Sequence, residues 1–129
     1  MRSRHLSTII RCSPERVYTF AANPDNLTKW ASGLVQSKVT HDGELLYVES
    51  PEGRTTIRFV GRNDLGVLDH DVTLPSGMTT SNPFRVLAHP EGAEVVFTLR
   101  QLELSDTEFD RDTAMVEADL RRLKELLES

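Results

Sequence analysis

The chain has 129 residues, of which 38% are hydrophobic and 27% are charged, and this composition is typical of one globular domain rather than of a disordered or membrane-spanning chain. Its formal net charge is −5, and its Lys and Arg residues form no cluster, which argues against a nucleic-acid backbone as the partner. We therefore expect a single folded domain over residues 1–129 that binds neither nucleic acid nor a membrane.

The chain contains one cysteine, Cys12, so an intrachain disulfide cannot form. The N-terminal residues Met1–His5 lead into a strand-like stretch instead of the apolar core of a signal peptide. These two observations predict a cytoplasmic protein.

The N-terminal part of the chain is expected to hold one strand followed by two short helices. Residues 5–12 are rich in β-branched and apolar side chains, which favours a strand. Ser13-Pro14 combines an N-cap residue with proline at the first helical position and predicts a helix over 14–22. Asn23-Pro24 repeats this signal and predicts a second, shorter helix that ends near Trp30.

Residues 35–103 have the pattern of an antiparallel meander. Short stretches of apolar and β-branched residues predict six strands here, and turn-forming residues separate them. The five turn signals are Asp42-Gly43, Glu52-Gly53, Asn63-Asp64, Pro75-Ser76-Gly77 and the tetrapeptide 89–92. With the strand at 5–12, we expect seven antiparallel strands.

A long C-terminal helix has the strongest local signal. Ser105 and Glu108 form a capping box, so the helix is expected to begin at Asp106. Apolar side chains follow in alternating steps of three and four residues, which predicts one buried face. They are Phe109, Val116, Leu120, Leu123 and Leu127, with Thr113 filling a gap. The same stripe fits a coiled-coil seam, but barely three heptads are present. Because one face of the meander must also be buried by another element, we expect the helix to pack on the sheet.

Tight turns set the register between neighbouring strands, and side chains alternate faces along each strand. Two-residue turns predict the pairs Val39 with Leu46, Ser37 with Val48, Leu46 with Phe59, Val48 with Ile57, Phe59 with Leu68 and Ile57 with His70. Longer loops predict the pairs His70 with Asn82, Leu68 with Phe84, Phe84 with Phe97 and Asn82 with Leu99.

These registers give the sheet one inner face with two rows of side chains. The apolar row is Val39, Leu46, Phe59, Leu68, Phe84 and Phe97, and the mixed row is Ser37, Val48, Ile57, His70, Asn82 and Leu99. Charged residues, among them Arg58, Asp71 and Arg85, fall on the opposite face, which is the solvated side. Pro83 has no amide hydrogen, so we expect a bulge at this point of the sheet.

The mixed row holds the polar side chains from which a site would be built. His70 and Asn82 are predicted cross-strand neighbours, and Ser37 lies on the same row. They would either orient a ligand carbonyl or hydroxyl at the polar end of an apolar cavity, or satisfy each other in the core. Because Asp69 and Asp71 alternate outward, His70 has no acidic partner, and we assign no catalytic residue.

Aromatic side chains would supply the walls of the cavity. Trp30 would either line its mouth or anchor the core. The candidate ligand-binding residues are Trp30, Ser37, Phe59, His70, Asn82, Phe84 and Phe97. No spacing of His or Cys residues fits a metal site, and the scattered single glycines form no nucleotide-binding loop, so we expect no metal and no cofactor.

Five stretches of the chain, at 13–18, 23–30, 66–74, 82–86 and 116–124, together with the order of the elements, resemble the START/polyketide-cyclase superfamily (SRPBCC). The last three are similar to a bacterial subgroup of cyclase-like proteins. The resemblance implies an α+β helix-grip fold: a curved seven-stranded antiparallel sheet with two short helices and a long C-terminal helix, and the first strand beside the last. It also implies a deep hydrophobic cavity between the sheet and the C-terminal helix.

Three functions stay open on this basis. Members of the superfamily bind lipids, sterols or polyketides, and some are cyclases, dehydratases or aromatases. We prefer non-catalytic binding of a small hydrophobic molecule, which would be lipid, polyketide or aromatic-like. The alternatives are a polyketide cyclase- or dehydratase-like enzyme that uses His70 and Asn82, and a homodimeric interaction module whose cavity is closed.

Overall fold

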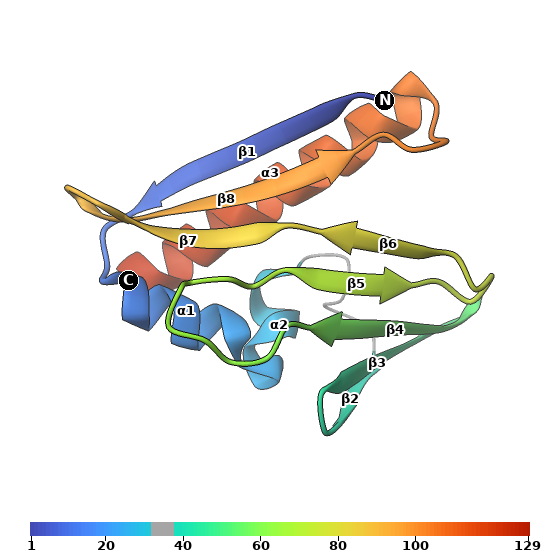
Figure 1. Cartoon of the computed structure of the whole chain (residues 1–129), viewed down its shortest axis with the longest axis horizontal. Helices are drawn as coiled ribbons and strands as arrows, with labels where there is room; N and C mark the ends of the chain where they lie inside the picture. The colour runs from blue at the N-terminus through green and yellow to red at the C-terminus, as the bar shows by residue number, and fades with distance from the viewer. Residues whose placement is uncertain (32–37) are drawn as a thin grey trace.

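The computed structural model describes residues 1–31 and 38–129, and these form three helices and eight strands (Figure 1). In chain order the elements are β1 (Ser3–Ile10), α1 (Pro14–Ala22), α2 (Pro24–Trp30), β2 (Lys38–Asp42), β3 (Leu45–Ser50), β4 (Gly53–Phe59), β5 (His70–Thr73), β6 (Thr79–Asn82), β7 (Phe84–His89), β8 (Gly92–Arg100) and α3 (Asp106–Glu128). The predicted α+β class, with antiparallel strands and a long C-terminal helix, is confirmed.

All three helices begin at the residues that their caps predict. The side chains of Ser13 and Asn23 each accept a hydrogen bond from a backbone amide in the first turn of the following helix. At α3, Glu108 N donates to Ser105 Oγ at 3.1 Å, and Ser105 N donates to Glu108 Oε1 at 3.0 Å. Each cap joins groups only two or three residues apart, so the local sequence is sufficient to position these helix ends.

The strands form two antiparallel sheets, so the prediction of one seven-stranded sheet is wrong. The three-stranded sheet has the order β1-β8-β7, and the five-stranded sheet has the order β2-β3-β4-β5-β6. The first strand lies beside the last, as the resemblance implies. Backbone hydrogen bonds from Leu68 N to Phe84 O and from Val86 N to Gly66 O, both of 2.8 Å, join the two sheets.

Pro83 is the point at which the expected single sheet divides. It interrupts what would be one strand, because it has no amide hydrogen for the ladder, and the flanking segments β6 and β7 then pair in different sheets. The ladder between β7 and β8 ends with the pair Phe84 and Phe97. Asn82 and Leu99, which were predicted to pair, therefore lie in different sheets, and Figure 1 shows β6 and β8 diverging beyond this point.

The predicted strand register is correct at two connections and shifted by two residues at three. As predicted, His70 faces Asn82 and Phe84 faces Phe97. The corrected pairs are Val39 with Val48, Leu46 with Ile57, Val48 with Thr55, Phe59 with His70 and Ile57 with Val72. A shift of two residues keeps every side chain on its face, so the inner and outer faces are unchanged.

Each shift has a local cause. Gly43 has a φ of 62° and takes the first central position of the turn between β2 and β3, where a positive φ is favoured. Pro51 cannot donate to the ladder and lies in the turn between β3 and β4. Between β4 and β5, the Asn63 side chain hydrogen-bonds four backbone groups between residues 61 and 67 and closes a longer loop in place of a two-residue turn.

The helices cover one part of the inner face closely. Helix α3 packs on β1 and α2, while α1 packs on β7 and β8 (Figure 1). We call this part the closed end, and its defining residues are Ile10, Val17, Val86, Val95 and Leu123, which are all buried. The buried stripe of α3 is thus packed on the sheet, as predicted, and Leu120, Leu123 and Leu127 belong to the core.

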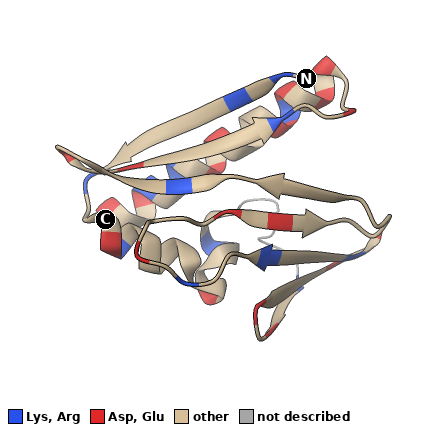
Figure 2. Cartoon of the chain, in the orientation of Figure 1, with Lys and Arg blue, Asp and Glu red and all other residues tan. Residues whose placement is uncertain are grey.

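The inner face along the end of β4, β5, β6 and the end of β8 is only half-buried. We call this part the open end, and its half-buried side chains are Phe59, His70, Val72, Thr80, Asn82 and Leu99. The outer face carries the exposed charges that were predicted there, and Figure 2 shows acidic and basic residues spread over the strands and α3. Within the part of the chain that the structure describes, no helix is long and apolar enough to span a membrane.

Candidate functional site

An aromatic cluster brings together five of the candidate residues where the closed end meets the open end. The His70 ring centroid lies 4.7 Å from that of Phe59 and 5.7 Å from that of Phe97. Phe84 lies 6.5 Å from His70, 5.3 Å from Phe97 and 5.9 Å from Trp30. Phenylalanines from three strands therefore surround the imidazole on β5, and Trp30, the last residue of α2, joins the cluster through Phe84.

The His70 imidazole is hydrogen-bonded to the segment that precedes β5. Its Nδ1 lies 2.9 Å from the backbone oxygen of Leu68. No residue of the described ranges hydrogen-bonds its Nε2. Burial lowers the pKa of His70, while the bond to Leu68 and the carboxylates of Asp69 and Asp71 act in the opposite direction. The imidazole is therefore neutral at physiological pH.

The two aspartates beside His70 are engaged on the outer face, as alternation predicts. Asp69 accepts two hydrogen bonds from the Arg85 guanidinium, at 2.8 and 2.6 Å, and one from Phe84 N at 2.9 Å. The hydrogen bonds from Arg85 are the main cause that lowers the pKa of Asp69. Asp71 accepts from Ser81 Oγ at 2.6 Å. Neither carboxylate orients the imidazole, so the described residues form no acid–base pair at His70.

Asn82 and Trp30 each have a polar group without a partner in residues 1–31 and 38–129. Asn82 pairs with His70 through the backbone ladder, but no described hydrogen bond joins its side-chain amide to the imidazole or to any other group. Trp30 is 5% exposed, so it anchors the core, yet no residue of the described ranges forms a hydrogen bond with its buried Nε1. A buried N–H without a partner is costly and rare in folded proteins. Ser37, the remaining candidate, lies outside the described residues.

A pocket of about 280 Å³ lies on the other side of the same strands. Its lining residues are Arg58, Phe59, Val60, Asp69, His70, Asp71, Ser81, Asn82 and Pro83. By alternation along the strands, six of these nine residues have side chains on the outer face, so the pocket lies on that face. Phe59, His70 and Asn82, whose side chains are on the inner face, also border it. We call it the outer pocket.

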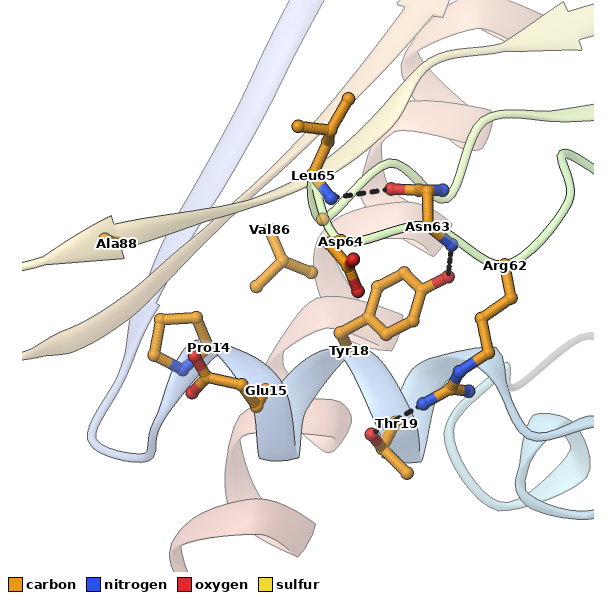
Figure 3. A pocket seen from close by; sticks show the side chains of 11 residues that line it. Pro14, Glu15, Tyr18, Thr19, Arg62, Asn63, Asp64, Leu65, Val86 and Ala88 are labelled. Atoms are coloured by element: carbon orange, nitrogen blue, oxygen red, sulfur yellow. Dashed lines mark hydrogen bonds between the residues drawn. The ribbon is translucent and has the colours of Figure 1, made fainter.

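A larger pocket, of about 420 Å³, lies between α1 and the loop that follows β4 (Figure 3). Its lining residues are Pro14, Glu15, Tyr18, Thr19, Arg62, Asn63, Asp64, Leu65, Gly66, Val86 and Ala88. Figure 3 shows the Tyr18 hydroxyl directed at Asn63, whose backbone amide donates to it at 3.0 Å. None of these residues is among the predicted candidates, because a two-residue turn at Asn63-Asp64 leaves no loop here. Gly61 and Gly66 on either side are the sequence signal for a longer loop.

Comparison with known proteins identifies the fold. No protein-family model matches the chain, and no curated protein matches it. Protein CV1439 from Chromobacterium violaceum has a similar solved structure, with a TM-score of 0.76, 17% identity, and coverage of 100% of this chain and 99% of that chain. The Aha1 protein from Colwellia psychrerythraea, solved in solution as a dimer, has a TM-score of 0.76 and 20% identity over 99% and 97% of the two chains.

DynU16, a protein of the dynemicin biosynthetic locus, is similar over part of its length. Its TM-score is 0.76 at 13% identity, and the match covers 98% of this chain but 47% of DynU16. At these identities the likeness concerns the fold alone. The chain therefore shares its α+β fold, with the long C-terminal helix, with these solved proteins.

Proposed function

We propose that this chain is a non-catalytic binding protein for one small hydrophobic molecule, which it holds against the open end of the inner face. The observation that carries the proposal is a pair of polar groups that have no hydrogen-bond partner within residues 1–31 and 38–129 and that belong to the region of the aromatic cluster. Within the described residues these groups are His70 Nε2 and the side-chain amide of Asn82, which both belong to half-buried residues of the open end. Apolar walls with a few polar groups that are free to orient a ligand are typical of small-molecule sites.

Binding is favoured over catalysis because His70 lacks what an acid–base residue needs. A general base is usually oriented by a third group, and the nearest carboxylates are bonded to Arg85 and Ser81 on the outer face. The half-buried open end also argues against an interaction module whose cavity is closed, because closed packing would bury His70 and Asn82 fully.

We further propose that the chain is a member of the START/polyketide-cyclase superfamily. The stretches that resemble this superfamily run through the whole chain, and the fold shared with DynU16, a protein of a biosynthetic locus, is consistent with it. The ligand classes of that superfamily are the ones from which we would choose probes.

The neutral fluorescent probe N-phenyl-1-naphthylamine tests the binding proposal. Its fluorescence is expected to rise on binding to the wild-type protein, and binding is expected to raise the unfolding temperature. The informative variant is Asn82→Trp, which fills the open end from β6. Its matched control is Ser81→Trp, because Ser81 is the next residue on the same strand and faces the outer pocket.

We expect Asn82→Trp to abolish probe binding and Ser81→Trp to leave it unchanged, with both variants folded by circular dichroism. Loss of binding in Ser81→Trp alone would move the ligand to the outer pocket and overturn the proposal. A folded wild-type protein that binds neither this probe nor any co-purified molecule in native mass spectrometry would overturn it as well.

We propose a homodimer as the assembly state. Among the described strands, β1 pairs with β8 alone, so its other edge is open to a second copy, and strand edges of this kind readily pair. The Colwellia Aha1 protein was solved as a dimer. Sedimentation equilibrium is expected to give twice the mass of the chain, and a single monomeric species at all concentrations would refute this.

A further inference from the structure

The imidazole nitrogen of His70 that no described residue bonds, Nε2, is a hydrogen-bond acceptor. A backbone carbonyl can only accept, so the 2.9 Å contact between His70 Nδ1 and Leu68 O requires the proton to be on Nδ1. In a neutral imidazole the other nitrogen, Nε2, then carries a lone pair. No residue in the described part of the chain donates to that lone pair.

The surroundings of the ring within the described residues keep the imidazole neutral and supply no donor to the lone pair. Three phenylalanine rings lie within 6.5 Å of it, measured between centroids. The nearby carboxylates, Asp69 and Asp71, point to the outer face and are bonded there. Burial outweighs their effect and lowers the pKa of His70. A ligand at the open end therefore meets an acceptor in an apolar surrounding.

Building on the binding function proposed above, we infer that the ligand carries a neutral hydrogen-bond donor, an O–H or N–H on an apolar body, and directs it at His70 Nε2. An ether or a tertiary amine of the same shape has only a lone pair to offer. Placing two acceptors against each other away from water leaves both unsatisfied, which costs binding free energy. The site thus selects hydroxyl- or N–H-bearing apolar molecules over their O- or N-methylated counterparts.

Two pairs of probes test this selection. 2-Naphthol and 2-methoxynaphthalene have the same ring system, but only 2-naphthol can donate, and indole and 1-methylindole repeat the comparison with an N–H donor. By titration calorimetry near neutral pH, we expect the donor of each pair to bind the wild-type protein about tenfold more tightly, since loss of a buried hydrogen bond has an effect of this order.

The variant His70→Phe keeps a ring at this position and removes the acceptor. We expect the preference for 2-naphthol to disappear in it, while 2-methoxynaphthalene binds as before. His41→Phe is the matched control, because His41 is exposed on β2, and it should keep the preference.

The outcomes separate this inference from the function on which it rests. Equal affinities of both members of each pair for the wild-type protein would overturn the donor requirement and leave ligand binding standing. Failure of all four probes to bind would count against the binding function itself. If His70→Phe does not fold, the affinities of the donor and methylated probes for the wild-type protein still test the donor requirement.

Discussion

The closed end and the open end of the inner face belong to one fold but are built differently. At the closed end, Ile10, Val17, Val95 and Leu123 come from four different elements and are all 0% exposed. At the open end, aromatic and polar side chains face the interior and remain half-buried. The difference indicates that close packing at one end holds the fold together, while the described side chains of the other end stay partly exposed.

Pro83 and Asp69 mark the border between the two ends. Pro83 ends the pairing of β7 with β8, so the sheets diverge from there toward the open end. Asp69 then accepts the amide hydrogen of Phe84 beside the division and also binds Arg85. A single side chain thus supplies the hydrogen bond that a continuous ladder would have supplied.

The largest expected effect is a difference between leucine-to-alanine substitutions at the two ends. Leu123 is 0% exposed, so Leu123→Ala should lower the free energy of unfolding by about 3 kcal/mol, through lost burial and a residual cavity. Leu99 is half-buried at the open end, and Leu99→Ala should cost about 1 kcal/mol or less. Urea unfolding measures both, and equal losses would contradict the distinction between the ends.

A smaller effect is expected at the border. Asp69→Ala removes the acceptor for Phe84 N and the ion pair with Arg85, and should cost about 1–2 kcal/mol, since the pair is partly exposed to solvent. Asp71→Ala is the matched control, because Asp71 binds only Ser81 among the described groups, and it should cost less than about 0.5 kcal/mol. Similar losses in both variants would show that Asp69 does not join the sheets.

The smallest effect concerns the dependence of stability on pH at the open end. Burial lowers the pKa of His70 below its ordinary value of 6.5, so the unfolded chain binds this proton more tightly than the folded protein does. As the pH falls below 6.5, the unfolded state takes up more protons, and the contribution of His70 to stability declines. His70→Phe should make the stability of the protein less dependent on pH in this range. The unfolding temperature, recorded over a series of pH values, measures the effect, and parallel curves for both proteins would contradict it.

The helices and the two faces of the sheets were predictable because their signals are local. Ser13, Asn23 and Ser105 each cap a helix through contacts of two or three residues. The inner face follows from alternation along each strand, and a shift of register by two residues does not change it. The cluster of Phe59, His70, Phe84 and Phe97 was found for this reason, although three registers were incorrect.

The remaining errors come from interactions that a turn signal does not contain. A glycine or proline indicates that a turn occurs but does not fix which position of the turn the residue takes. The turns at Gly43 and at Pro51 each lie one residue away from the predicted position. The loop that includes Asn63 depends on hydrogen bonds with residues up to four positions away and with Tyr18 on α1. The pocket lined by Tyr18 and Asn63 was missed because it requires α1 to lie against this loop, which no short stretch of sequence indicates.

The sequence by itself determined the helix ends, the alternation of faces and the identity of the side chains that meet at His70. Caps and alternation act over a few residues, which is why they can be read directly. Only the tertiary structure decided that the strands divide into two sheets at Pro83, that Trp30 is buried with no described residue bonded to its Nε1, and that His70 Nδ1 is bonded to Leu68 while no described residue bonds its Nε2. These features depend on how segments distant in the chain pack together, and packing decides which polar groups find a partner.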